Sequence, residues 1–359
     1  MSDHIDVLLY GLGAIGSFYA FILSRSERVR LTVVARSNYD AVVKNVRSLC
    51  PINYTGNISA DLEIRELLST ARTMALTSSV PTEVYYAEFL VFEAPEAEYT
   101  STVIKTPAEA SAMDYVVCAH KAIDQEDVAT KLQPVVDQKR TTIVIIQNGV
   151  GNEEAFRKTF PESSILTCVT WVGATQISPG VVKHTKSEDM QIGLFPNPEV
   201  APSKEQQRLD TFAGLLEHGQ TRFQVLDDMQ RQRWEKVVWN VAWNSITTIT
   251  MLDTQTWLHS SIEAEPITRK VMRQVINVAR ASGVPLEDSL VDQLMDKINS
   301  MPGIGSSMQT DCKNGRPMEV DVILGFPMRK AREFGVPADS LEMLYALVLA
   351  QDHKIRASL

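Results

Sequence analysis

The chain has 359 residues, of which 44% are apolar, enough to fill the cores of about two domains of roughly 150 residues each. Lys and Arg number 35 against 44 Asp and Glu, and the net charge of −9 comes without a long run of one sign, so we expect no nucleic-acid partner. No apolar run approaches the roughly 20 residues that cross a bilayer, and the first residues lack the features of a signal peptide. We therefore expect no membrane partner and a cytoplasmic location.

The cysteines do not indicate a metal site or a disulfide framework. Cys50, Cys118, Cys168 and Cys312 are far apart in the sequence and form no C-x-x-C pair. Such spacing is typical of reduced, structural thiols, so we predict no metal site.

A glycine-rich turn lies near the start of the chain. Residues 6–10 form an apolar run of strand type, residues 14–25 have the spacing of a buried helix, and the junction carries a G-x-G-x-x-G pattern. In a dinucleotide-binding turn these glycines allow the tight turn, the approach of the pyrophosphate and the close packing of helix on strand. The predicted cofactor-binding residues are Gly11, Leu12, Gly13, Ala14, Ile15 and Gly16. The alternative is a tight turn that binds no ligand.

A second strand-like run, residues 30–36, completes a β-α-β unit and ends in Arg36 and Ser37. An Asp or Glu at this position usually meets the ribose 2′-hydroxyl of NAD, whereas a guanidinium can pair with a 2′-phosphate. Arg36 therefore predicts NADP(H), that is NADPH and NADP+, as the cofactor. The alternative is an ordinary solvated arginine at a strand end.

Polar residues follow two later strand-like runs. Residues 113–124 read as a strand that leads into His120 and Lys121, and residues 141–156 as a strand that leads into Gln147, Asn148 and Gly149. Ligands of open α/β sheets lie beyond the carboxyl ends of the strands. Lys121 is a candidate for phosphate or substrate charge, and Asn148 for a ribose or nicotinamide group, although each alone could be an ordinary loop residue.

The segment between Arg36 and Lys121 is long for one crossover, and we interpret part of it, within about residues 50–110, as an insertion. It contains a helical candidate at 59–71 and a strand-like run at 83–94, to which we assign no role. Residues 165–195 are strand-rich, with a turn at Pro179-Gly180, and a helix at 203–217 and a strand at 222–227 follow. The remainder is helical, so we place one domain at 1–227 and a second, all-helical domain at 228–359.

The first helix of the second domain carries a polar stripe. Lys236, Asn240 and Asn244 follow one another at four-residue spacing and share one helix face among apolar neighbours. A buried ammonium and two buried amides are costly without partners. A cleft that holds a polar substrate would supply those partners, and an internal hydrogen-bond network is the alternative.

A second polar cluster lies in residues 305–326. Ser306 and Gln309 have the spacing of a capping box, Gly315 can end one helix, and Pro317 can begin the next. Ser307 is a candidate substrate contact or merely a helix-start residue. Glu319 is a candidate acid or merely a complement to a helix dipole.

Seven segments together resemble the ketopantoate reductase (2-dehydropantoate 2-reductase) family, in the family's order and over most of the chain. They are GLGAIGS, AHKAID, IIQNGVGNEE, VGATQISPGVVKHT, WEKVVWNVAWNS, SSMQTDCKNGRPMEVD and FGVPADSLEMLYALV. The resemblance implies a fold of class α/β plus all-α: a Rossmann-type NADP-binding domain followed by a helical domain similar to the C-terminal domain of 6-phosphogluconate dehydrogenase. It also implies NADPH-dependent reduction of 2-dehydropantoate to (R)-pantoate, on the route to pantothenate and coenzyme A.

The resemblance further assigns roles to individual residues. Lys236 matches the family's catalytic lysine, and Glu319 matches an acid that orients it and contacts the cofactor and substrate. Substrate-binding positions are matched by Asn240, Asn244, Ser307 and Lys121. Cofactor-binding positions are matched by the glycine turn, Arg36, Lys121 and Asn148. A homodimer is a further hypothesis, because helical domains of this type often pair.

The chain departs from the family pattern in three places. Residues 249–261 carry Asp253 and Thr254 where a Gly- or Asn-containing turn is common, the segment 37–112 is longer, and Pro327 stands within an expected helix. Two alternatives therefore stay open: a paralogue that reduces a different 2-oxo acid, and a non-catalytic NADP(H)-binding sensor.

Overall fold

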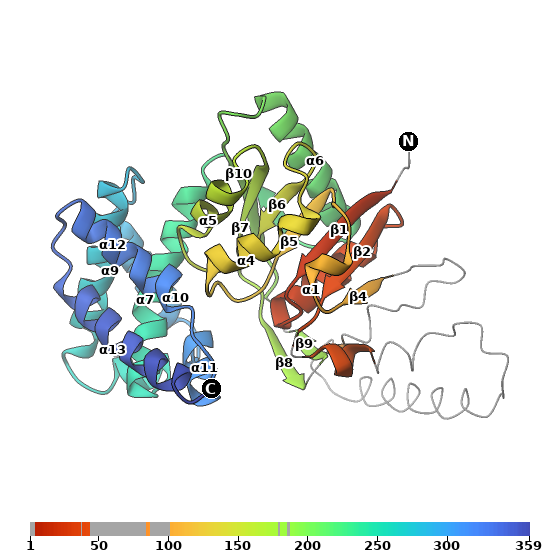
Figure 1. Ribbon diagram of the computed structural model, residues 1–359. Coiled ribbons are helices and arrows are strands. Elements are labelled where there is room, and N and C mark those ends of the chain that lie inside the picture. The colour runs from red at the N-terminus through yellow and green to blue at the C-terminus, as the bar shows by residue number, and fades with distance from the viewer. Residues whose placement is uncertain (1–3, 37, 44–83, 87–100, 179, 185–186) are drawn as a thin grey trace, which may run out of the picture.

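The computed structural model describes residues 4–36, 38–43, 84–86, 101–178, 180–184 and 187–359. An eight-stranded sheet forms the centre of the first part of the chain (Figure 1). In spatial order the strands of this sheet are β11 (Phe223–Val225), β10 (Met190–Phe195), β7 (Ser164–Thr170), β6 (Thr142–Ile145), β5 (Tyr115–Cys118), β1 (Ile5–Tyr10), β2 (Val29–Val34) and β4 (Thr102–Ile104). All neighbouring pairs are parallel except β7 and β10.

The central strands are mostly apolar because both of their faces are covered. In β1, Val7 and Leu9 point into one core, and Leu8 and Tyr10 point into the other. Side chains alternate between the two faces of a strand, so a strand that is buried on both sides reads as a nearly continuous apolar run. The strand-like runs predicted at 6–10, 30–36, 113–124 and 141–156 therefore form the middle of the sheet.

Helices cover both faces. The helices α1 (Ala14–Ser24) and α6 (Pro202–His218) pack on one face, and α4 (Gln125–Lys131) and α5 (Asn152–Thr159) pack on the other. The strand order reverses at β1, which has β2 on one side and β5 on the other. In doubly wound sheets ligands bind at this reversal, at the carboxyl ends of the strands. The predicted Rossmann-type architecture is confirmed.

Strand β4, which joins the sheet beside β2, was not predicted. A separate small sheet contains β3 (Val84–Tyr86), β9 (Val181–His184) and β8 (Ala174–Ser178). These three strands fall within the strand-like run at 83–94 and the strand-rich segment at 165–195, but their separation from the main sheet was not predicted. The predicted helix at 59–71 lies outside the described residues. So do Ser37, Cys50, Pro179 and most of the expected insertion.

The second part of the chain is helical, as predicted, and has its own apolar core. Its helices are α7 (Met229–Thr250), α8 (Thr254–Leu258), α9 (Ala264–Ala281), α10 (Ser289–Asn299), α11 (Ser307–Lys313), α12 (Phe326–Glu333) and α13 (Asp339–Arg356). Figure 1 shows these helices together at one side of the sheet. Among the described residues, every helix is too short or too polar to cross a bilayer.

Pro327 was expected to interrupt a helix, but it does not. It stands in the first turn of α12, directly after a π-helical segment, Asp321–Gly325. A proline is tolerated in a first turn because the N–H group that it lacks would have no intrahelical partner there. The path from the π-helical segment into α12 therefore stays helical.

A buried arginine joins α7 to the sheet. Arg233, with 1% of its side chain exposed, forms an ion pair of 2.8 Å with Glu153, which is equally buried. Its guanidinium also donates to the backbone oxygens of Ile145 (3.3 Å), Gln147 (3.0 Å) and Gly149 (2.9 Å) at the end of β6. Nε donates to the hydroxyl of Thr167 as well. The guanidinium of Arg233 therefore attaches α7 to β7 and to the end of β6.

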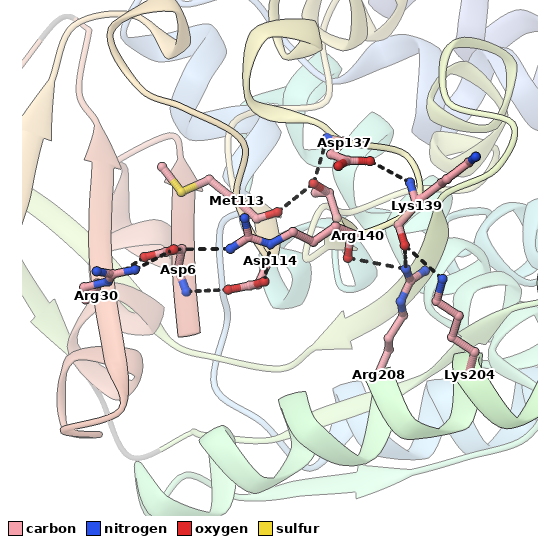
Figure 2. A network of polar contacts seen from close by, with 10 residues as sticks. Asp6, Arg30, Met113, Asp114, Asp137, Lys139, Arg140, Lys204 and Arg208 are labelled. Atoms are coloured by element: carbon pink, nitrogen blue, oxygen red, sulfur yellow. Dashed lines mark hydrogen bonds and ion pairs between the residues drawn. The ribbon is translucent and has the colours of Figure 1, made fainter. Parts of the chain in front are cut away.

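A second polar network lies at the opposite edge, where the strands begin. Figure 2 shows Asp6 on β1 between Arg30 on β2 and Arg140 in the loop before β6. Asp114 accepts from Arg140 Nε (2.7 Å) and from the backbone N–H of Asp6 (2.8 Å), and these contacts outweigh its partial burial and lower its pKa. This network ties the amino ends of the strands together, away from the ligand-binding edge.

The Arg233–Glu153 pair predicts a large effect on stability. Replacement of Arg233 by Met leaves a buried carboxylate without its cation, so we expect the free energy of unfolding to fall by about 3–5 kcal/mol in urea denaturation. The double variant Arg233→Met/Glu153→Leu should lose less than the sum of the two single variants, because it leaves neither charge unpaired.

The exposed pair Arg332–Glu342 provides a control. Arg332→Met should change the free energy of unfolding by less than about 1 kcal/mol. An equally small change for Arg233→Met would contradict the role given to the buried pair.

Candidate active site

The glycine turn between β1 and α1 requires glycine at two positions. Gly11 has a φ of +104°, and a Cβ there would lie 2.5 Å from the Cα of His120. A Cβ on Gly16 would lie 1.8 Å from the carbonyl oxygen of Gly11. The turn therefore brings the end of β1 against the end of β5.

Gly13 differs, because a Cβ there would meet no atom within 4 Å. It is the N-cap of α1, which has no capping side chain and no acidic residue in its first turn. The N–H groups of Ala14 and Ile15, in the first turn of this helix, have no intrahelical acceptor and lie at the positive end of the helix dipole. This arrangement fits a pyrophosphate. Leu12, between the glycines, is buried, and its carbonyl oxygen accepts from Asn38 Nδ2 (2.7 Å).

Arg36 is exposed just beyond the end of β2 and lines a pocket of about 460 Å³. Lys105 and Lys131 line the same pocket, together with Tyr10 and Pro134. The three cationic side chains could bind an anionic group, and the apolar side chains could pack against a flat ring attached to it. From the sequence alone only Arg36 is a candidate, because the two lysines come from distant segments.

A hydrogen-bond network connects the ends of β5 and β6. Gln147 Nε2 donates to the backbone oxygen of His120 (2.9 Å), and Gln125 Nε2 donates to Gln147 Oε1 (2.8 Å). Burial lowers the pKa of His120 to about 4, so its imidazole is neutral at pH 7. Asn148 is half-buried next to this network, and its carbonyl oxygen accepts from Asn152 Nδ2 (2.8 Å).

Lys121 reaches from the end of β5 to the helical part, where it forms an ion pair with Asp311 on α11. The Asp311 side chain is 5% exposed and also pairs with Arg316 (3.0 Å). Burial lowers the pKa of Lys121, and the carboxylate of Glu319 opposes that shift. Asp311 was not predicted, because the sequence does not show which helix lies opposite Lys121.

Lys236 lies on α7, where its ammonium donates to the backbone oxygen of Thr170 at the end of β7. Its Nζ lies 5.1 Å from the ring centre of Trp171. Burial, together with the charges of Arg233 and Lys297, lowers the pKa of Lys236 to about 7, although Glu319 opposes the shift. An amine with such a pKa can both hold and release a proton near neutral pH.

The negative charge of Glu319 acts on both Lys121 and Lys236. It opposes the lowering of the pKa that burial causes in each lysine. One of its carboxylate oxygens accepts from the backbone N–H of Ala122 (2.8 Å). Among the described residues it forms no ion pair with Lys236. The structure thus places the acid within electrostatic range of Lys236 and binds it to the loop that carries Lys121.

The two asparagines of the polar stripe on α7 are buried as predicted, and Lys236 is half-buried. Asn240 and Asn244 are 7% and 5% exposed, and Asn240 Nδ2 has no hydrogen-bond partner among the described residues. Ser307 is exposed at the first position of α11. The cap is Ser306, whose hydroxyl accepts from the N–H of Gln309 (3.0 Å).

The expected capping box is only half formed. The side chain of Gln309 does not return to the cap but donates to the backbone oxygens of Thr247 and Leu252 (2.9 Å each). These bonds attach α11 to the carboxyl end of α7. They hold Ser307 close to the helix that carries the polar stripe.

Two family models match the chain. Residues 78–197 match "Ketopantoate reductase PanE/ApbA", and residues 228–352 match "Ketopantoate reductase PanE/ApbA C terminal". A curated 2-dehydropantoate 2-reductase of Nostoc sp. is 24% identical, over 71% of this chain and 77% of the relative. An uncharacterized protein of Saccharomyces cerevisiae is also 24% identical, over 98% of this chain and 94% of its own length.

A solved structure extends the similarity to three dimensions. The 2-dehydropantoate 2-reductase of Methylococcus capsulatus is 25% identical to this chain and superposes with a TM-score of 0.73, covering 98% of both chains. These findings confirm the resemblance drawn from the sequence motifs. Because the sheet and the helical part match successive portions of one family, in the same order, the chain belongs to the ketopantoate reductase family of oxidoreductases.

Proposed function

We propose that this protein is an NADPH-dependent reductase of a 2-oxo acid, with 2-dehydropantoate, reduced to (R)-pantoate for pantothenate and coenzyme A biosynthesis, as the leading substrate. The observation that carries the proposal is Lys236. Its ammonium lies at the ligand-binding edge of the sheet, and its pKa of about 7 suits a proton donor. A protein that only bound the dinucleotide would have no need for such a group.

The cofactor site is proposed from the residues that fit it. The amino end of α1 and Gly13 would hold the pyrophosphate, and Arg36 with Lys105 and Lys131 would hold the 2′-phosphate. Asn148 and the buried network around His120 lie at the ends of β5 and β6, where the nicotinamide half would bind. NADPH, when bound, supplies the hydride for the carbonyl carbon of the substrate.

The proton is proposed to come from Lys236. An ammonium has three N–H groups, and the described residues use one of them for the oxygen of Thr170, so others are free for the carbonyl oxygen. Hydride addition makes that oxygen negative, and the same ammonium both stabilises the charge and delivers the proton. The negative charge of Glu319 favours the protonated form of the lysine between turnovers.

The substrate is proposed to lie against α7. Asn240 Nδ2 is a buried donor without a partner among the described residues, and a polar substrate would satisfy it. Asn244 and the hydroxyl of Ser307 are further candidates for this contact. Lys121, which now pairs with Asp311, is a candidate for the substrate carboxylate or the cofactor. The cytoplasmic location and the homodimer stay predictions.

The first test replaces Lys236 by Met, which keeps the length of the side chain and removes the proton. We expect kcat with 2-dehydropantoate to fall by about 10²–10⁴-fold, while the Kd of NADPH changes little. NADPH absorbance measures the first quantity and fluorescence titration the second. Lys270→Met, on the exposed surface of α9, is the matched control.

Two results would contradict the proposal. An unchanged kcat in Lys236→Met would remove this lysine from its role. A complete lack of turnover by the unmodified protein, with NADPH still bound, would favour the non-catalytic sensor.

The pH profile provides a second test. The proposed donor must be protonated in the free enzyme, so kcat/KM should be constant below about pH 7 and fall tenfold per pH unit above it. We expect this descending limb because burial lowers the pKa of Lys236. A profile that stays flat to pH 9 would show that its protonation does not limit the reaction.

The third test concerns the choice of cofactor. Arg36→Ala should weaken NADPH binding by about 10–100-fold, since a charge-assisted contact with the 2′-phosphate is lost, and should leave NADH binding nearly unchanged. Arg36→Lys, which keeps the charge, should lose less. Equal affinities of the unmodified protein for NADPH and NADH would overturn the assignment.

A further inference from the structure

Two ammonium groups share the ring of Trp171, the residue that directly follows β7. The ring centre lies 5.1 Å from Nζ of Lys236, on α7, and 4.0 Å from Nζ of Lys297, on α10. Both distances are within the range of about 6 Å for a cation–π interaction. Because both distances are measured from one ring centre, the two nitrogens are at most 9.1 Å apart. Two cations at this separation repel each other, and the proposed reaction gives Lys297 no role.

The ring of Trp171 is held in place on several sides. Its backbone N–H donates to the carbonyl oxygen of Asp189 (2.9 Å), the residue before β10. Its ring lies edge-on to that of Trp239 on α7, with 6.3 Å between the ring centres. The ammonium of Lys297 contacts both rings, since its Nζ also lies 5.3 Å from the ring centre of Trp239. Lys297 therefore attaches α10 to the end of β7 and limits the movement of the Trp171 ring.

The ammonium of Lys236 is located by two successive residues. It donates to the backbone oxygen of Thr170 and lies over the ring of Trp171. The oxygen of Thr170 uses one of its three N–H groups, and the ring covers one of its sides. These two contacts limit the directions that the remaining N–H groups can take, so the orientation of the ring matters for a proton donor.

The charged groups that act on Lys236 come from several elements. Burial is the main cause of its lowered pKa, and the charge of Arg233 on α7 adds to the effect. The carboxylate of Glu319 opposes the shift, and the ammonium of Lys297 supports it. The charge of Arg233 is compensated by the buried carboxylate of Glu153 on α5 (2.8 Å).

Lys297 has no such compensation. The described residues place no carboxylate within 4.0 Å of its Nζ, although Asp189 and Glu235 line the same pocket of about 350 Å³ beside Trp171. Burial around its ammonium lowers its pKa, although the residue as a whole is exposed. Its positive charge therefore acts on the neighbouring ammonium without a close anion to cancel it.

We propose that Lys297 is a positioning residue for the proposed reaction: it fixes the ring of Trp171 beside Lys236, and its charge makes the ammonium of Lys236 a readier proton donor. The inference rests on the proposed role of Lys236 and deepens it, because it names the groups that place and adjust that amine. Lys297 acts through Lys236, and we assign it no contact with the substrate.

The first test replaces Lys297 by Met, which removes the charge but keeps a flexible side chain that packs well against an aromatic ring. The pKa of Lys236 should rise, because a nearby positive charge is lost. The descending limb of the kcat/KM profile with 2-dehydropantoate should therefore move upward by about 0.5–1 pH unit. Lys297→Arg, which keeps the charge and stacks on aromatic rings, should leave the limb in place. Lys270→Met also removes one surface charge and is the matched control, which should not move the limb.

Trp171 provides a second, coupled test. Without the ring, the ammonium of Lys297 loses its contact and is expected to turn toward solvent, so Trp171→Leu should move the limb nearly as far as Lys297→Met. The double variant should move it no further, because both changes remove the same interaction. Trp171→Phe, which keeps a ring, should move it less. Fully additive movements, or equal losses of kcat/KM at every pH with the limb unmoved, would contradict the inference.

A labelling measurement tests the same interaction without turnover. The reaction of Lys236 with acetic anhydride at a series of pH values, followed by mass spectrometry of its peptide, reports the protonation of this amine. The midpoint should lie at about pH 7 in the unmodified protein and about 0.5–1 pH unit higher in Lys297→Met. An unchanged midpoint would overturn the inference, whatever the kinetics show. If the midpoint moved but the unmodified protein reduced no 2-oxo acid, the proposed function would fail, while the effect of Lys297 on Lys236 would be confirmed.

Discussion

The position of the proposed proton donor depends on the buried guanidinium of Arg233. This group bonds to three carbonyl oxygens at the end of β6 and to Glu153, so it fixes the start of α7 against the sheet. Lys236 lies one turn further along the same helix, and its own bond to Thr170 reaches the end of the next strand, β7. A shift of α7 would therefore move Lys236 relative to the ends of β5 and β6, where the cofactor is proposed to bind.

Local patterns were sufficient to predict much of this arrangement. The period of the apolar residues predicted the central strands, and the glycine spacing predicted the turn before α1. The four-residue spacing of Lys236, Asn240 and Asn244 predicted a common face of α7, on which the two asparagines are buried and the lysine is half-buried. Each of these features depends on residues that are close in the sequence. Glu319 was singled out by the family resemblance, because its own surroundings also suited an ordinary helix-start residue.

The features that were missed all depend on contacts between distant segments. The pairing of Lys121 with Asp311, the approach of Lys297 to Trp171 and the carbonyl contacts of Arg233 join residues far apart in the chain. Strand β4 is three residues long, too short for a pattern of alternation to be recognised. The half-formed capping box has the same cause, since the side chain of Gln309 bonds to α7, which the local sequence does not show.

The ion pair between Lys121 and Asp311 has a consequence for the entry of an anion. Asp311 is buried but has two cationic partners, and Arg316 would still neutralise it if Lys121 moved away. The side chain of Lys121 is 43% exposed, although burial around its ammonium lowers its pKa. An incoming anion could therefore replace Asp311 as the partner of Lys121. Asp311 would keep its ion pair with Arg316, so its buried charge would not be left uncompensated. Lys121 could therefore leave Asp311 and bind an anionic ligand at little electrostatic cost.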